Sequence, residues 1–223
     1  EEGAFVIQDI SSMLAVEALG LPKMDNQGTL KILDICAAPG GKSMLAADIL
    51  NHADIDYMLE ARDISEYKVE LMQENFNRCH LNKAKAVAWD ALEPDERWLG
   101  QADVVIADIP CSGLGVIGRK RDIKYKMTPQ VVQDIVELQE KILKVAASYV
   151  KKGGKLLFST CTVNKDENEA HVKWIQDTLK MTPVSLNGTL PGLVHSPTTQ
   201  QGFVQLIPGM QDTDGFFISV FEK

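Results

Sequence analysis

Two cysteines stand at the ends of apolar runs, where a thiol could do covalent chemistry. Cys111 follows the run in "ADVVIADIPCSG", and Cys161 follows the run in "LLFSTCTVNKDENE". A cysteine thiolate is a strong nucleophile that forms covalent intermediates, so two thiols at one site would indicate a working pair. A buried cysteine can also be only a small hydrophobic residue. The chemistry of the residues leaves open which thiol would attack.

Carboxylates follow the other apolar runs in the same way. Asp34, Asp63, Asp90 and Asp108 each lie at or just after such a run. In doubly wound folds an acid after the second strand usually binds ribose hydroxyls, and an acid after the third can reach an adenine amino group. Each aspartate could instead only cap the turn or helix that follows it. An acid that recurs after each of several consecutive strands favours a nucleoside ligand over a capping role alone. S-adenosylmethionine is a ligand that fits these positions.

The segment "DICAAPGGK", residues 34–42, is a predicted turn between a strand and a helix. Gly40 and Gly41 allow the backbone to approach a ligand closely, and the amides that open the helix can hold an anionic group. The spacing matches neither the dinucleotide fingerprint nor the Walker loop. Lys42 could contact a bound base or a cofactor carboxylate, and the sequence does not separate these two roles.

Strand and helix patterns alternate along the chain. Continuous apolar strands separated by helices predict an α/β fold with a mostly parallel sheet covered on both faces. Such sheets bind ligands at the carboxyl ends of their strands, where the chemistry-bearing residues fall. The predicted strands are residues 30–37, 55–62, 85–89, 102–109, 151–160 and 215–223, and the predicted helices are residues 7–21, 40–50, 65–79, 128–150 and 164–179.

Length and composition favour one globular domain over residues 1–223, because 45% of the residues are hydrophobic and 24% are charged. No apolar run is long enough for a membrane span, and the first residues do not resemble a signal peptide. The four cysteines are widely spaced, so no metal site is predicted, and free thiols are typical of a reducing compartment. We therefore expect a cytoplasmic protein, and a monomer.

The charge distribution bears on nucleic-acid binding. The net charge of −8 argues against a nucleic-acid partner when taken alone, because phosphate contacts need basic side chains. The segment "GRKRDIKYK", residues 118–126, is however strongly basic and follows Cys111 directly. It is either a solvated loop or a phosphate-binding loop. Its candidate phosphate contacts are Arg119, Lys120, Arg121, Lys124 and Lys126.

Five segments together resemble the RNA cytosine-C5 methyltransferases of the NOL/NOP/Sun (Fmu) family, and most of all its bacterial RsmB/Sun branch, which modifies 16S ribosomal RNA. The similarity extends over nearly the whole chain. It implies a Rossmann-like class I S-adenosylmethionine-dependent methyltransferase fold and an RNA substrate. Members of this branch usually have an additional N-terminal RNA-binding region related to the antitermination factor NusB, so the resemblance implies that this chain is the catalytic domain without that region. The segments are "GAFVIQDISSMLA", "LDICAAPGGKS", "DIPCSGLGVIGRKRDIKYK", "FSTCTVNKDENE" and "QLIPGMQDTDGFF".

The resemblance also implies roles for individual residues. Cys161 is the implied nucleophile, which would add to C6 of the cytosine so that C5 becomes reactive, and Cys111 is the implied assistant for release of the product. Asp108 would bind the base edge, with Lys42 on the base or the cofactor. The implied cofactor residues are Cys36, Ala37, Ala38, Pro39, Gly40, Gly41, Lys42, Asp63, Asp90 and Asp108.

Some alternatives stay open at this point. DNA cytosine-C5 methyltransferases attack with the cysteine of a Pro-Cys motif, which here would be Cys111. The chain could methylate transfer RNA or another RNA, or it could be a catalytically silent module for RNA binding or ribosome assembly. Two residues depart from the family pattern, namely Ile109 in place of alanine and Arg62 before the second-strand acid.

Overall fold

The apolar strands alternate their side chains between the two faces of one sheet. In the computed structural model, which describes residues 3, 5–24, 28–190 and 196–223, neighbouring residues such as Ile32 and Leu33 belong to different hydrophobic cores. Both faces are therefore buried, as expected of a parallel sheet. The strands are β1 (Leu30–Asp34), β2 (Tyr57–Asp63), β3 (Ala84–Ala88), β4 (Ala102–Asp108), β5 (Val150–Thr160), β6 (Thr182–Pro183), β7 (Phe203–Leu206) and β8 (Phe216–Glu222).

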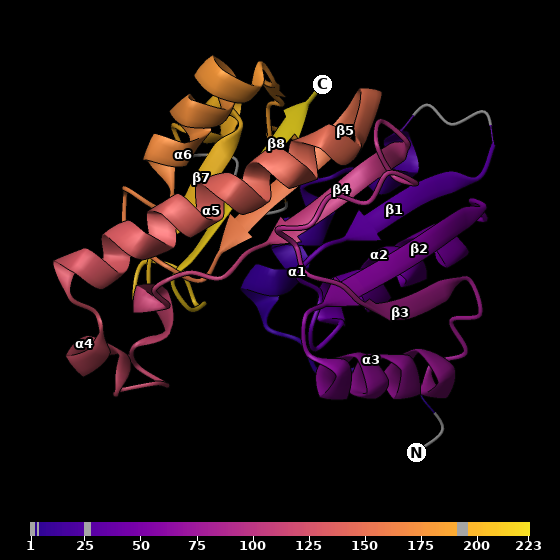
Figure 1. Cartoon of the computed structure of the whole chain (residues 1–223), viewed down its shortest axis with the longest axis horizontal. Helices are drawn as coiled ribbons and strands as arrows, with labels where there is room; N and C mark the ends of the chain where they lie inside the picture. Colours follow the sequence, from indigo (N-terminus) through magenta and orange to yellow (C-terminus); the bar gives the residue numbers. More distant parts are fainter. Residues whose placement is uncertain (1–2, 4, 25–27, 191–195) are drawn as a thin grey trace.

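The strand order is β3-β2-β1-β4-β5-β8-β6, and β7 also pairs with β8 (Figure 1). Strands β1 to β5 are parallel to one another, whereas β8 runs antiparallel to β5. The order reverses between β1 and β4, and this is the switch point at which doubly wound sheets bind their ligands.

Helices cover the two faces of the sheet. One core includes residues of α1, α2 and α3, and the other includes residues of α5 and the α6 region (Figure 1). No helix in the described ranges is long and apolar enough to cross a membrane. The helices are α1 (Ile10–Glu17), α2 (Gly41–His52), α3 (Glu66–Arg78), α4 (Ile123–Lys126), α5 (Pro129–Tyr149) and α6 (Glu169–Trp174), with a π-helical turn at Ile175–Leu179 and 3₁₀ turns at Leu21–Lys23, Leu114–Val116 and Thr199–Gln201.

The predicted alternation of strands and helices is confirmed, but two helices are shorter than predicted. Helix α1 begins only after Asp9, whose carboxylate accepts the Ser11 amide, and the chain turns at Gly20 with φ 61°. Residues 164–168 form turns before α6, because the side chains of Thr162 and Asn164 bond the backbone amides two residues further along. The strands β6 and β7 and the helix α4 had no predicted counterpart.

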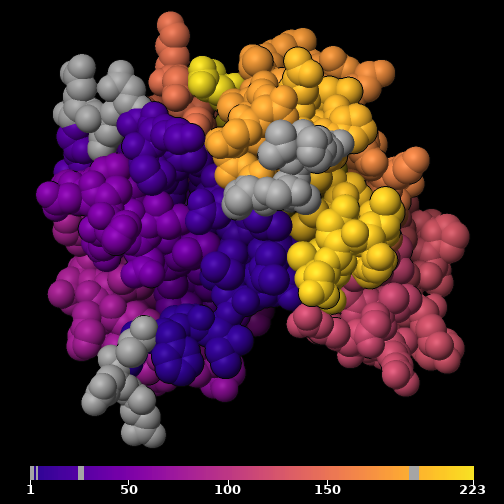
Figure 2. Space-filling view, turned by 180° about the vertical axis from the view of Figure 1, so that it is seen from behind, coloured from indigo at the N-terminus to yellow at the C-terminus, as the bar shows by residue number. Residues whose placement is uncertain are grey.

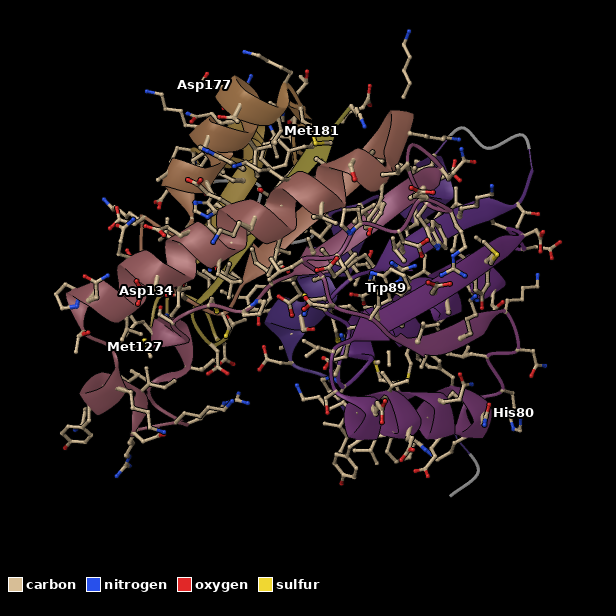
Figure 3. All side chains as sticks on the ribbon, in the orientation of Figure 1. His80, Trp89, Met127, Asp134, Asp177 and Met181 are labelled. Carbon is tan, nitrogen blue, oxygen red and sulfur yellow. The ribbon has the colours of Figure 1, made fainter. Side chains whose placement is uncertain are left out.

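Arg62, the unusual residue of the second strand, is 1% exposed beneath the carboxyl edge of the sheet. Its guanidinium donates to Glu60 and Asp95 and lies 4.8 Å from the ring centroid of Trp89. Trp89 follows β3 and is labelled in Figure 3. The guanidinium of Arg97 and that of Arg62 hold the pKa of Asp95 below its usual range. Arg62 is therefore the buried centre of an ion-pair network that supports the loops above it.

Candidate active site

The loops after β1, β2, β3, β4 and β5 bring the predicted site residues to one edge of the sheet. The strand register brings the carboxyl ends of β1, β4 and β5 to the same edge, since Asp34 is paired with Ile106 and Asp108 with Ser159. From behind, the N-terminal residues lie beside the C-terminal strands at this site (Figure 2), and α1 contacts β8 and β5.

The turn after β1 is shaped by its glycines. Gly40 is the N-cap of α2 and has a φ of 97°, which side chains other than that of glycine rarely allow. A Cβ there would also lie 3.3 Å from Met72 and 3.4 Å from Phe76. The Ala37 amide donates to the Arg62 carbonyl at 2.7 Å, which ties the turn to the end of β2. The backbone therefore stays close to the space above the strand ends.

Two cavities meet at Cys36 above the strand ends. The first, of about 220 Å³, lies along the turn and reaches Asp108. The second, of about 260 Å³, is more apolar and contains Asp63 and Asp90. Their lining residues together span the ends of β1 to β4. The first is lined by Ile7, Gln8, Asp9, Ser12, Asp34, Cys36, Ala37, Ala38, Pro39, Gly41, Lys42 and Asp108, and the second by Ile35, Cys36, Asp63, Ile64, Lys68, Trp89, Asp90, Ala91, Leu92, Pro110, Leu138 and Ile142.

Asp34 is a polar residue of the first cavity and one of the acids that follow the strands, although the family resemblance does not include it among the implied cofactor residues. It is 1% exposed, and its Oδ2 accepts a 2.7 Å hydrogen bond from the Ser43 hydroxyl. Its Oδ1 has no partner among the described residues. Burial raises the pKa of Asp34 to about 7, against the effect of the Ser43 hydrogen bond. A cationic ligand group in this cavity would supply the missing partner.

Asp63 and Asp90 are compatible with both of the roles that the sequence left open. Each accepts a backbone amide two residues ahead, from Ser65 at 3.0 Å and from Leu92 at 2.9 Å. Each also lines the second cavity. A turn-forming role and a ligand-binding role are therefore compatible at these positions, since a carboxylate has two oxygens.

Lys42 and Asp108 form an ion pair at the boundary of the first cavity. The Nζ of Lys42 lies 2.6 Å from Asp108 Oδ2 and 3.1 Å from the Ser12 hydroxyl. The Ser159 hydroxyl donates to the other carboxylate oxygen of Asp108 at 2.8 Å. Lys42 is only 8% exposed, whereas the side chain of Asp108 is 30% exposed. Asp108 is thus the member of the pair that a substrate can reach.

The two cysteines are in direct contact. The Sγ atoms of Cys111 and Cys161 lie 3.3 Å apart, and both thiols are free. A thiol of Cys111 that donates to Cys161 lowers the pKa of Cys161 in spite of its burial. The same hydrogen bond, together with burial, raises the pKa of Cys111. With the proton on Cys111, the shared hydrogen bond stabilises a thiolate on Cys161.

A buried polar network holds the two cysteine loops together. Glu167 Oε2 accepts the amide of Ser112 at 2.8 Å and the side-chain amide of Gln139 at 3.1 Å. The Ser112 hydroxyl contacts both Glu167 and the Thr162 hydroxyl. These residues have no role predicted from the sequence. Glu167 lies in the helix predicted over 164–179, and no pattern in that segment indicates that its side chain points inward.

The basic segment 118–126 lies beside the site, but its residues differ in their partners. Arg119 bridges to Asp9 at 3.1 Å and to Asp214 at 3.0 Å, which ties the segment to α1 and to the β7–β8 loop. Lys126 pairs with Asp122 at 2.6 Å within the segment. Lys120 is exposed, and its charge lowers the pKa of Cys161, so it lies near the thiols.

Comparisons with known proteins agree with this arrangement. A family model described as 16S rRNA methyltransferase RsmB/F matches residues 21–222. The chain is 38% identical over its full length to the probable ribosomal RNA small subunit methyltransferase B of Bacillus subtilis, of which it covers 48%. It is 30% identical over 99% of its length to ribosomal RNA small subunit methyltransferase F of Escherichia coli, of which it covers 45%. The chain thus spans about half the length of these relatives.

Solved structures show the same fold. NSun6 from Pyrococcus horikoshii, solved with the S-adenosylmethionine analogue SFG, matches the whole chain with a TM-score of 0.82 and 28% identity, and 54% of that structure is covered. A methyltransferase homolog from the same organism matches the whole chain with a TM-score of 0.80 and 26% identity, and 69% of it is covered. The predicted class I methyltransferase fold and the S-adenosylmethionine dependence of the family are confirmed. With its cleft at the β1–β4 switch point and its matched family model, this chain belongs to the RsmB/F family of 16S rRNA methyltransferases.

Proposed function

We propose that residues 1–223 form the catalytic domain of a cytoplasmic enzyme that methylates C5 of a cytosine in small-subunit ribosomal RNA. The reaction would proceed through a covalent bond between Cys161 and C6 of the base. The observation that carries this proposal is the contact of two free thiols, 3.3 Å apart, beside the cleft that contains Asp108. A methyltransferase that acts on an amino nitrogen has no use for such a pair.

The described residues fit S-adenosylmethionine. The unpartnered Asp34 Oδ1 suits the cofactor's ammonium group, and the turn at Gly40 leaves room for a closely approaching ligand. Asp63 and Asp90 in the second cavity suit the ribose and the adenine amino group. When bound, the cofactor supplies an electrophilic methyl group on a sulfonium. Its polar amino-acid part suits the first cavity, which contains Asp34 and Asp108, and its adenosine part suits the more apolar second cavity, which contains Trp89.

Asp34→Asn should weaken cofactor binding about tenfold or more, because a charge-assisted hydrogen bond becomes a neutral one. The wild-type affinity should rise as the pH increases through about 7, since the carboxylate of Asp34 ionises in that range. The affinity of the variant should be nearly constant between pH 6 and pH 7.5. Calorimetric titration with the cofactor checks both effects, and an unchanged pH profile in the variant would contradict the role of Asp34.

The covalent step begins at Cys161. Its thiolate adds to C6 of the cytosine, which makes C5 electron-rich enough to accept a methyl group. Asp108, held by Lys42 and Ser159, would accept a hydrogen bond from the amino group of the base, and its carboxylic acid form would donate the proton that N3 needs as negative charge develops on the ring. After methylation a base must take the proton from C5, so that the electrons of the C5–H bond restore the ring double bond while the Cys161–C6 bond breaks and Cys161 leaves as a thiolate. Cys111, in contact with Cys161, is the group proposed to assist this release.

The RNA must present an unstacked base, because a stacked cytosine cannot reach thiols in a cleft. We propose that the segment 118–126 binds the neighbouring phosphates. Lys120→Gln should weaken RNA binding and make the slope of log affinity against log salt less steep by about 0.7 to 0.9. Arg119→Gln should change the slope less, because Asp9 and Asp214 already neutralise Arg119.

The salt series can be measured by filter binding or fluorescence anisotropy with single-stranded RNA. Lys173→Gln on α6 is a matched control, since it removes an exposed charge from the opposite face of the sheet. Equal slopes for the wild type, Lys120→Gln and Lys173→Gln would exclude the segment as a phosphate-binding surface.

The function itself is tested by incubating the protein and labelled S-adenosylmethionine with small-subunit ribosomal RNA that lacks modifications. We expect label in the RNA, and 5-methylcytosine at a defined position when the product is digested and mapped. Transfer RNA in a parallel reaction tests the substrate class. Cofactor binding without label in either RNA would favour the silent RNA-binding module instead.

A further inference from the structure

The two thiols are chemically equivalent, yet their surroundings are not. Cys111 and Cys161 share one hydrogen bond, so only one of them can be the thiolate at a time. We infer that Glu167 makes this choice: its buried negative charge keeps the proton on Cys111 and leaves Cys161 as the attacking sulfur. Glu167 would be a positioning residue, because it acts through the thiols and does not touch the substrate. The inference rests on the proposed function.

Glu167 joins the two loops through the backbone next to Cys111. It lies in the segment that follows Cys161, but its Oε2 accepts the amide of Ser112, the residue after Cys111, at 2.8 Å. The Ser112 hydroxyl and the side-chain amide of Gln139 also donate to it, and the same amide donates to the Pro110 carbonyl. The hydroxyl of Thr162, the residue after Cys161, makes a longer contact of 3.4 Å. Glu167 is 0% exposed. Its shorter contacts therefore place its charge nearer to the loop of Cys111 than to that of Cys161.

That charge is hydrogen-bonded but not neutralised. The donors to Glu167 in the described part of the chain are hydroxyls and amides, none of which carries a positive charge. In a buried site an unscreened charge acts strongly on a neighbouring ionisable group. A second negative charge on Cys111 is therefore disfavoured, and burial adds to this effect.

The charges around Cys161 offset one another more than those around Cys111 do. Asp108 disfavours a thiolate there, but Lys42 pairs with Asp108 at 2.6 Å and offsets much of its charge. Lys120 and the backbone amide of Cys161 favour the thiolate. On the side of Cys111, only the amide of Gly113 among the named groups favours ionisation. The shared hydrogen bond and burial act on the pair as a whole, and the carboxylate of Glu167 is the fixed negative charge that adds to them on the side of Cys111.

The thiol preference can be measured without RNA, by alkylation with iodoacetamide over a pH series and mass spectrometry of the two cysteine peptides. In the wild type we expect Cys161 to react faster below pH 8. In Glu167→Gln the Cys161 to Cys111 rate ratio should fall about tenfold, because one pKa unit changes the thiolate fraction tenfold. The glutamine keeps the size and most hydrogen bonds of the glutamate. An unchanged ratio in folded Glu167→Gln would overturn the inference.

Two controls separate charge from structure. Asp166→Asn removes an exposed carboxylate one residue away and should leave the ratio unchanged. Ser112→Ala removes a hydroxyl contact of Glu167 but keeps its charge, so Cys161 should remain the faster thiol. A ratio that falls equally in Ser112→Ala would assign the preference to loop geometry and overturn the electrostatic inference.

A second experiment does not depend on the folding of Glu167→Gln. Cys111→Ala and Cys161→Ala each leave a single thiol of the pair beside an intact Glu167. The lone Cys161 should be alkylated at lower pH than the lone Cys111, and the reverse order would overturn the inference. Failure of the proposed function looks different, because RNA would then form no adduct whichever thiol is more reactive.

Discussion

Cys161→Ala is expected to abolish methyl transfer to RNA, with a loss of at least about 10³-fold, because the remaining thiol, that of Cys111, is the proposed assistant of release and not the proposed nucleophile. Cofactor affinity should be unchanged, since Cys161 lines neither cavity. The contact with Cys111 would be lost, and Cys111 would then be a lone thiol beside Glu167. Single-turnover assays with labelled cofactor measure the loss, and calorimetry checks that the variant still binds the cofactor.

Cys111→Ala is the matched variant, and its expected result is different in kind. Cys161 can still attack, but release is no longer assisted, so a covalent protein–RNA adduct should accumulate. Denaturing gel electrophoresis with labelled RNA detects such an adduct directly. Our assignment would be wrong if Cys161→Ala turned over while Cys111→Ala formed no adduct, since Cys111 would then be the nucleophile.

Arg62→Met should lower the free energy of unfolding by about 3 kcal/mol, because it leaves two buried carboxylates without their shared cation. In a domain of this size such a loss corresponds to a fall in Tm of about 6–12 °C. The methionine fills much of the space of the arginine stem, so the creation of a cavity is not the main cause of the expected destabilisation. Lys85 and Arg97 still bridge to Glu60 and Asp95, which keeps the expected loss at the lower end of the range for a broken buried pair. Chemical denaturation at pH 7 measures the difference.

The control is Arg97→Met, which removes an exposed cation from the same carboxylate. The side chain of Arg97 is 63% exposed, so its loss should destabilise the protein much less than the loss of Arg62. The depressed pKa of Asp95 gives the pH dependence. Its stabilisation is present above the unfolded value near pH 4 and is lost as the pH falls toward the folded value, so the variants should converge with the wild type in acid. If both variants lost the same free energy of unfolding at pH 7, Arg62 would not be the buried centre of the ion-pair network.

The fold could be predicted from the sequence because its signals are local. Apolar runs, glycine turns and acids after strands depend on neighbouring residues, and they indicated a parallel sheet with loops gathered at one edge. The helix over 164–179 was predicted to begin too early, because that prediction also used only the local pattern. Its first residues satisfy a helical pattern, but the side chains of Thr162 and Asn164 compete for the backbone amides.

The sequence by itself determined the family, the order of the main strands and helices other than β6, β7 and α4, and the short motifs that carry Lys42, Asp108 and the two cysteines. Their catalytic roles remain predictions until the variants are measured. Only the tertiary structure brought Glu167 to Ser112 and placed the two sulfurs in contact, across 55 and 50 positions of sequence. The register of β4 against β5, with Asp108 beside Ser159, sets these contacts. No local pattern encodes that register, because it depends on how the two hydrophobic cores pack against the sheet as a whole.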